Sequence, residues 1–262
     1  MSELIRMEHI TKRFPGVTAN ENVTLVFDRG EVHALLGENG AGKTTIMNVL
    51  YGLLHADEGR ILVEGKPAAI NSPNDAIAYG IGMVHQHFML IPKFTVAENV
   101  VLGTRIAKQP FLDLGPARER IREISRSTGL NIDPDAKVSE LSIGDQQRVE
   151  IIKAIYKGAR VLIMDEPTSV LTPQEVDELF TVLRAWVAQG NTVIFITHKM
   201  REVMEVCDRI SILRNGKYIA TVRTKDTNPD EVAQMMVGRQ VSLEMEKEIG
   251  RASCRERVLR LV

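Results

Sequence analysis

The chain of 262 residues contains few cysteines and almost no net charge. Its two cysteines, Cys207 and Cys254, cannot build a disulfide framework, so the composition indicates a reducing compartment. The formal net charge of −1 removes the electrostatic basis for nucleic-acid binding, and we expect no nucleic-acid partner. With 44% hydrophobic and 26% charged residues, the composition is that of a globular protein with a sizeable core.

Long apolar segments are also missing from the sequence. No run approaches the roughly 18 to 20 apolar residues that a membrane-spanning helix needs. The first six residues lack the basic-then-apolar order of a signal peptide. We therefore expect a cytosolic protein that reaches a membrane only through a partner.

The most informative segment present is GENGAGKT at residues 37–44, which fits the pattern G-x-x-x-x-G-K-[ST]. A strand-like run precedes it at 31–36, and a helix-like run follows at 45–51. A glycine-rich turn between a strand and a helix start exposes backbone N–H groups to phosphate oxygens. A glycine-rich turn that binds nothing is disfavoured by eight matched positions in this context. The candidate nucleotide-binding residues here are Gly37, Asn39, Gly40, Gly42, Lys43, Thr44 and Thr45.

Two acidic residues follow a second apolar run. Residues 161–164 read as a buried strand, and Asp165 and Glu166 come directly after it. Phosphoryl transfer needs a carboxylate that holds Mg²⁺, which suits Asp165, and hydrolysis needs a base for the attacking water, which suits Glu166. Lys43 would contact the β- and γ-phosphates and the Thr44 hydroxyl would ligate Mg²⁺. The alternative, a strand followed by two surface acids, is weakened by the upstream phosphate loop.

The pattern along the chain alternates between strands and helices. Residues 4–35 indicate short strands with turns, and from about residue 95 to 156 the pattern becomes helical. Further strands are predicted at 60–64, 81–86, 161–164 and 192–197, helices at 96–102, 117–128, 142–155 and 173–189, and an Asn-Gly hairpin at 210–220. We therefore expect an α/β core with a helical insertion.

The segment LSIGDQQR at residues 141–148 resembles the LSGGQ signature of the ATP-binding-cassette (ABC) ATPases, and it precedes the acidic strand as in that family. Alone, such a segment could be a helix N-cap formed by Ser142. The resemblance implies that Ser142 and Gly144 contact the γ-phosphate of a partner's ATP. It places Gln86 at the Q-loop, near Mg²⁺ and the attacking water, and His198 at the switch histidine that contacts the γ-phosphate. Phe14 occupies the position of the aromatic residue that stacks on adenine, although a buried N-terminal aromatic is the plain alternative.

The resemblance implies a fold and a domain organisation. The fold is a P-loop NTPase ABC cassette with a RecA-like core, an N-terminal antiparallel β-subdomain and an inserted α-helical subdomain. The core would comprise residues 1–94 and 157–240, and the helical signature subdomain residues 95–156. Residues 241–262 would be a solvated tail or linker, or sequence derived from cloning.

The chain is most similar to the first cassette of tandem-cassette importers for nucleosides and simple sugars. Segments 14–17, 82–90 and 166–175 carry this likeness, and segment 82–90 favours nucleosides over sugars. It implies an ATP-hydrolysing subunit, with ATP and Mg²⁺ as cofactors, at the cytoplasmic face of the membrane. The implied partners are a second ABC cassette, transmembrane permease subunits and, indirectly, a substrate-binding protein. A regulatory cassette with little hydrolysis and a soluble non-transport ABC ATPase remain alternatives.

Three positions depart from the family pattern. Ile143 replaces a glycine of the signature, Asp145 replaces its glutamine, and Thr172 replaces the aspartate of the D-loop. The resemblance implies that both segments act across a dimer of cassettes. These substitutions therefore bear on the rate of hydrolysis at one of two sites, but not on the binding of ATP by the chain itself.

Overall fold

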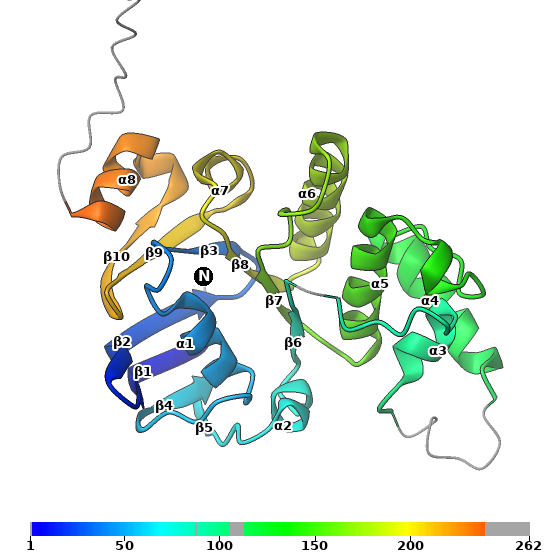
Figure 1. Ribbon diagram of the computed structural model, residues 1–262, viewed down its shortest axis with the longest axis horizontal. Helices are drawn as coiled ribbons and strands as arrows, with labels where there is room; N and C mark the ends of the chain where they lie inside the picture. Colours follow the sequence, from blue (N-terminus) through cyan, green and yellow to red (C-terminus); the bar gives the residue numbers. More distant parts are fainter. Residues whose placement is uncertain (1, 87, 105–112, 239–262) are drawn as a thin grey trace, which may run out of the picture.

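The computed structural model describes residues 2–86, 88–104 and 113–238. Residues 241–262, predicted to be a tail or linker, lie outside the described residues. The strands form two sheets (Figure 1). The smaller is antiparallel with the order β2-β1-β4-β5, formed by β1 (Glu3–Phe14), β2 (Val17–Asp28), β4 (Glu58–Val63) and β5 (Lys66–Ala68).

The larger sheet has six strands in the order β10-β9-β3-β8-β7-β6. Strands β9, β3, β8, β7 and β6 run parallel to one another. Within this sheet, β10 is antiparallel to its neighbour β9. The strands are β3 (Val32–Leu36), β6 (Ile81–Val84), β7 (Val161–Asp165), β8 (Thr192–Ile196), β9 (Arg209–Arg214) and β10 (Lys217–Arg223). The predicted strands at 81–86, 161–164 and 192–197 and the hairpin at 210–220 are thus confirmed.

Strands β1 and β2 are much longer than the short strands predicted in this region. Both contain a residue with positive φ, His9 at 54° and Asn22 at 50°, and the register shifts between Met7 and Ile10. The Nδ1 atom of His9 lies 2.8 Å from Oδ1 of Asn22, so the two irregular positions face each other. Such bulges interrupt the alternation of apolar and polar residues, which hides the continuous strand in the sequence.

The hydrophobic core is divided by the six-stranded sheet. Alternate residues of β3 show this, because Leu35 packs toward the antiparallel sheet and α1 (Lys43–Leu50), whereas Ala34 and Leu36 pack toward the other helices. Both faces of this sheet are buried, which explains the continuous apolar runs of β7 and β8. Helix α1 therefore lies between the two sheets, with its N-terminus at the end of β3.

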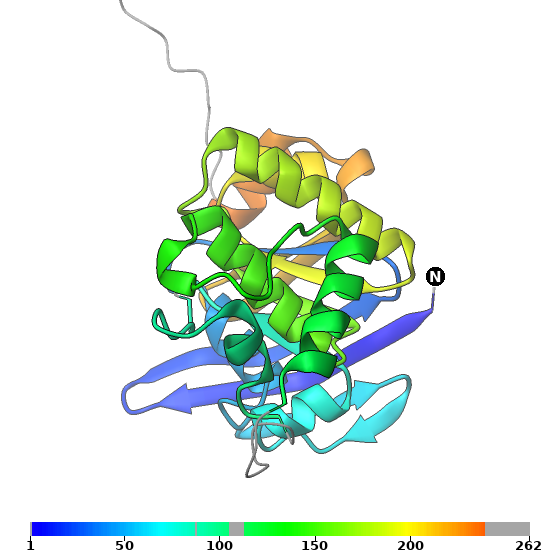
Figure 2. The same cartoon turned by 90° about the vertical axis from the view of Figure 1, so that its right-hand side faces the viewer.

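Helices cover the opposite face of the large sheet and extend beyond it (Figure 2). The described helices, besides α1, are α2 (Pro73–Ala78), α3 (Val96–Val101), α4 (Gly115–Thr128), α5 (Ile143–Tyr156), α6 (Pro173–Ala188), α7 (Met200–Val206) and α8 (Pro229–Val237), with short 3₁₀ turns at η2 (Val138–Glu140) and η3 (Thr224–Asp226). The four predicted helices correspond to α3, α4, α5 and α6. Sequence reasoning missed α2, α7 and α8, which are short.

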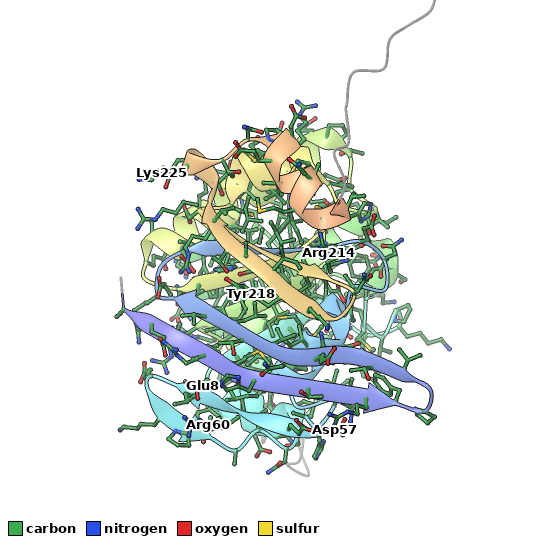
Figure 3. All side chains as sticks on the ribbon, turned by 90° about the vertical axis from the view of Figure 1, so that its left-hand side faces the viewer. Glu8, Asp57, Arg60, Arg214, Tyr218 and Lys225 are labelled. Atoms are coloured by element: carbon green, nitrogen blue, oxygen red, sulfur yellow. The ribbon has the colours of Figure 1, made fainter. Side chains whose placement is uncertain are left out.

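The antiparallel sheet presents a polar outer face (Figure 3). Arg60 on β4 pairs with Glu8 on β1 at 2.6 Å, and the Asp57 carboxylate accepts the backbone N–H of Arg13. These contacts link β4, and Asp57 just before it, to the middle and the end of β1. None of the helices in the described part of the chain combines the length and hydrophobicity that crossing a bilayer requires.

Candidate functional site: a phosphate-loop cleft

The phosphate loop connects β3 to α1, as the sequence predicts. Gly40 and Gly42 have φ of 82° and 92°, in the left-handed region that residues with a Cβ rarely adopt. A Cβ on Gly42 would also lie 2.4 Å from the carbonyl oxygen of Ala19. Gly42 is the N-cap residue of α1 and, as a glycine, has no side chain that could cap the helix, so the N–H groups of the first turn stay available to an anion.

The side chain of Lys43 folds back along the loop. Only 7% of the residue is exposed, and its Nζ donates to the carbonyl oxygens of Gly37 at 2.7 Å and Glu38 at 3.1 Å. Burial lowers the pKa of Lys43, while the negative charges of Glu166 and Asp165 act in the opposite direction. The loop therefore holds a buried ammonium beside two carboxylates at the start of a helix.

Asp165 is the last residue of β7 and is 7% exposed. Burial raises the pKa of this carboxyl group, a hydrogen bond with Thr44 lowers it, and the neighbouring charge of Glu166 raises it further. The parallel strands β3 and β7 end on the same edge of the sheet, which brings Asp165 to Thr44. Oxygen donors of this kind are the ligands that Mg²⁺ prefers.

Glu166 lies at a sharp change of direction after β7. Its φ is 47°, and its backbone N–H donates to the carbonyl oxygen of Ile196 on β8 at 2.9 Å. A positive φ in a residue other than glycine is a strained conformation that often occurs at functional sites. The Oε1 atom lies 3.0 Å from Nδ1 of His198, which follows β8. The parallel pairing of β7 and β8 therefore brings together two residues that are 32 positions apart.

Phe14 and Gln86 lie in the same cleft as the phosphate loop. The cleft has a volume of about 710 Å³. It is lined by Phe14, Val17, Thr18, Ala19, Asn39, Gly40, Ala41, Gly42, Lys43, Thr44, Thr45, Gln86, Asp165, Glu166, Asn215 and Gly216. Phe14 is 41% exposed, which argues against the buried-aromatic alternative. The Nζ of Lys12 lies 5.6 Å from the centroid of the Phe14 ring, a cation–π contact.

Sequence reasoning missed part of the cleft wall. Ala19 on β2 and the turn Asn215–Gly216 between β9 and β10 also line it. The N–H of Glu21 donates to the carbonyl oxygen of Gly216 at 2.8 Å, and the buried amide of Asn20 donates to that of Gly42 at 3.2 Å. The Asn-Gly turn was predicted, but its position beside β2 depends on the order of strands in the two sheets.

Ser142 and Gly144 are predicted site residues that do not lie among the lining residues of this cleft. Ser142 is the N-cap of α5, where its Oγ accepts the N–H of Asp145 at 3.1 Å, as the N-cap alternative anticipated. Gly144 is buried against α6, and a Cβ there would lie 2.4 Å from Oε1 of Glu175. In Figure 1, α5 and α1 lie on opposite sides of β7. Gly37 and His198 adjoin the cleft through their contacts with Lys43 and Glu166.

The residues present fit a nucleoside triphosphate with Mg²⁺. The loop N–H groups and Lys43 suit phosphate oxygens, and the exposed face of Phe14 suits an adenine ring. Thr44, Gln86 and Asp165 offer a hydroxyl, an amide and a carboxylate oxygen to a hard cation. The fold and this cleft define the chain as a P-loop nucleotide-binding cassette.

Comparison with known proteins identifies the family. Residues 20–169, more than half of the chain, match the ABC transporter family. The chain is 50% identical over 244 residues to the nucleoside import ATP-binding protein NupA of Lactococcus lactis, which covers 93% of this chain and 48% of that protein. It is 52% identical over 247 residues to the guanosine import ATP-binding protein NupO of Bacillus subtilis, covering 94% and 48%. It is 48% identical over 272 residues to the glucose import ATP-binding protein TsgD13 of Haloferax volcanii, covering 93% and 50%.

Solved structures agree with this assignment. The ADP-bound form of MJ1267, an ATP-binding cassette of an ABC transporter, has a TM-score of 0.79 at 28% identity, covering 91% of this chain and 100% of that one. A dimeric post-hydrolysis state of the cassette MJ0796 with ADP and Pi has a TM-score of 0.71 at 27% identity, covering 84% and 99%. The chain belongs to the ABC transporter family, and the predicted fold class is confirmed. It spans about half the length of the curated relatives that it matches.

Proposed function

We propose that the chain is the ATP-binding and ATP-hydrolysing part of an importer for nucleosides or simple sugars. The proposal that the chain hydrolyses ATP rests on one observation, the position of the Glu166 carboxylate. This carboxylate lines the cleft of the phosphate loop, and His198 holds it at 3.0 Å. Relatives named for import of nucleosides, guanosine and glucose support the transport role. Identities of 50% and 52% to the nucleoside and guanosine proteins keep nucleosides as the favoured cargo.

Each residue of the cleft has a distinct role in this proposal. Lys43, with the N–H groups of the loop from Gly37 to Thr45, binds the phosphates, and Phe14 stacks on adenine. Glu166 accepts a proton from the attacking water, and His198 orients Glu166 and contacts the γ-phosphate. Thr44, Asp165 and Gln86 would hold Mg²⁺, which supplies charge neutralisation on the phosphates when it is bound.

The proposed active unit is a pair of cassettes, since Ser142 and Gly144 do not reach the cleft of their own chain. Each would contribute to the cleft of a partner, either a second ABC cassette or another copy. The dimeric structure of MJ0796 with ADP and Pi supports this arrangement. Closure on ATP would move permease subunits at the cytoplasmic face of the membrane through the helical segment 95–156, and a substrate-binding protein would act indirectly.

A replacement of Glu166 tests hydrolysis. Glu166→Gln keeps the size and hydrogen-bonding capacity of the side chain but removes the base, so steady-state phosphate release should fall by about 100-fold or more. Binding of a fluorescent ATP analogue should persist. Glu205→Gln, at an exposed position on α7, is the matched control and should keep parental turnover. Unchanged phosphate release in Glu166→Gln would remove Glu166 from the proposed role.

A regulatory cassette that hydrolyses little ATP is the second candidate. The observation that favours it is the contact of Ser142 with Asp145, which occupies a group proposed to bind a partner's nucleotide. Steady-state ATP turnover per chain, measured at increasing chain concentration, separates the two functions. An importer subunit should gain turnover per chain as pairing increases, whereas a purely regulatory cassette should remain slow at every concentration.

A further inference from the structure

The hydroxyl of Ser142 is already used within its own helix. It accepts the N–H of Asp145 at 3.1 Å, and it donates its only proton to Oδ2 of Asp145 at 2.8 Å. A phosphate oxygen only accepts hydrogen bonds, so Ser142 can bind one only after giving up this contact. The residue that accepts this proton, Asp145, is one of the two positions that depart from the family signature.

Asp145 also places a negative charge at this helix start. Its Oδ1 lies 3.3 Å from a terminal nitrogen of Arg148, one turn further along α5. The other terminal nitrogen of Arg148 pairs with Glu178 on α6. One guanidinium is thus shared between two carboxylates, and Asp145 is only partly neutralised.

A third carboxylate lies next to the signature glycine. Glu175 closes a capping box with Thr172, whose hydroxyl donates to Oε2 at 2.8 Å, while Oε1 occupies the space beside Gly144. The first turn of α5 and the first two turns of α6 therefore bring together Asp145, Glu175 and Glu178. Arg148 forms ion pairs with Asp145 and Glu178, two of these three carboxylates. An approaching triphosphate is strongly anionic and would meet like charge here.

We propose that Asp145 is a positioning residue that weakens ATP-driven pairing, both by holding the Ser142 hydroxyl and by repelling the γ-phosphate bound to the partner cassette. This inference rests on the proposed function, because it assumes that Ser142 serves the partner's cleft. The site that receives this segment then closes less readily than one whose signature bears a neutral residue. In a pair with a different second cassette, the two sites would be unequal for that reason.

The test uses the full 262-residue chain with Glu166→Gln, so that bound ATP is not consumed. Pairing is measured by sedimentation equilibrium with Mg²⁺ and ATP from low to high NaCl. Replacing Asp145 by Asn keeps the shape but removes the charge, and pairing should tighten by at least about threefold at low salt. The difference in pairing affinity between the Asn variant and the parent should decrease as the salt concentration rises, because ions screen charge repulsion. A purely structural effect of the substitution would not depend on salt in this way.

Three further variants test the same charge arrangement. Asp145→Gln restores the family residue and should also tighten pairing, which guards against a folding defect in one variant. Glu178→Gln frees Arg148 to neutralise Asp145 and should tighten pairing slightly. Arg148→Gln should weaken pairing in the parent but much less in a chain that already carries Asp145→Asn, so the two changes are coupled. Affinity of the single chain for a fluorescent ATP analogue should stay the same throughout.

The outcomes separate this inference from the function on which it rests. If the parent and all variants bind ATP but never pair, the composite site itself is wrong, and the inference falls with it. If the chains pair on ATP and the Asn and Gln replacements of Asp145 match the parent at every salt concentration, the inference is overturned while the proposed function stands. Tighter pairing with a salt-dependent difference supports both.

Discussion

The phosphate-loop cleft and the starts of α5 and α6 are built in opposite ways. The cleft draws its lining from β1, β2, the β3–α1 loop, β7 and the β9–β10 turn, and it leaves the N–H groups of α1 without a side-chain cap. Helices α5 and α6 are each capped by their own side chains, Ser142 and Thr172. The N–H groups of the first region are free to bind an anion. In the second region the N–H groups at the helix starts already bind the capping side chains, and acidic residues lie beside them.

This difference shows why a single chain can bind a nucleotide and still lack a complete site. Binding groups in the cleft are held by contacts within the chain, such as Lys43 on the Gly37 carbonyl. The signature groups are turned toward contacts of their own helix and must exchange them for a partner's phosphate. Substitutions should therefore affect nucleotide affinity in the cleft and pairing at the helix starts, with little overlap.

The largest effect on ATP affinity is expected from removing Lys43. Lys43→Ala deletes the buried ammonium beside Asp165 and Glu166, and charge-assisted hydrogen bonds of this kind contribute about 2 kcal/mol. ATP affinity of the single chain should fall by about 30-fold or more, measured by titration of a fluorescent ATP analogue. Lys217→Ala, on an exposed strand start, is the control and should bind normally. An unchanged affinity in Lys43→Ala would contradict the role of the cleft.

The same substitution in the two regions gives a direct comparison. Gly42→Ala introduces a Cβ at a φ of 92° and within 2.4 Å of a backbone oxygen that cannot move away. It should destabilise the chain by about 1 to 3 kcal/mol in urea unfolding and weaken ATP binding. Gly144→Ala also meets an atom at 2.4 Å, but that atom ends the flexible side chain of Glu175. Its unfolding free energy should change by less than about 1 kcal/mol, and ATP affinity of the single chain should persist. Equal losses in the two variants would show that the regions are not built differently.

The sequence predicted the cleft better than the other region for a physical reason. Phosphate-loop residues lie within eight consecutive positions, so their geometry is local and readable from the chain. The carboxylates after β7 were found because they directly follow an apolar run that is typical of a buried strand, and that pattern is also local. The hydrogen bond between Ser142 and Asp145 is equally local. The charge around it, however, depends on Glu175 and Glu178, which lie on α6 about 30 residues further along the chain. Bulges at His9 and Asn22 likewise hid the full length of β1 and β2.

A smaller effect is expected at the outer end of the cleft. Phe14 exposes 41% of its surface there, and Lys12 lies over its ring. Phe14→Ala should lower ATP affinity by about fivefold, because aromatic stacking contributes on the order of 1 kcal/mol. Phe14→Tyr keeps the ring and should bind as the parent does. If inorganic triphosphate, which has no base to stack, loses affinity to the same extent in Phe14→Ala, the adenine contact is wrong.

The smallest effect concerns the strand that carries the phosphate loop. His33 on β3 is fully buried, with Nδ1 2.8 Å from Glu31 and Nε2 2.8 Å from the hydroxyl of Ser211. Burial lowers the pKa of His33 despite the opposing effect of Glu31. Burial alone would raise the pKa of Glu31, but its contacts with His33, the Asp28 N–H and Arg209 lower it overall. Both groups thus bind protons more weakly in the folded chain than in the unfolded chain.

The contribution of neutral His33 to the free energy of unfolding should therefore be fully present above the ordinary histidine pKa of about 6.5. It should decline as the pH falls below that value. Glu31 adds a further loss at lower pH, below the ordinary range of a glutamate. The midpoint of thermal unfolding should fall by a few degrees between about pH 7.5 and 5.5. His33→Gln, which removes the titrating group, should be less stable at the upper end of that interval yet show a flatter pH dependence across it. His9→Gln, on the exposed bulge, should follow the parent. If the unfolding midpoint of His33→Gln changes with pH as steeply as that of the parent, other groups cause the pH dependence and His33 on β3 has no role in it.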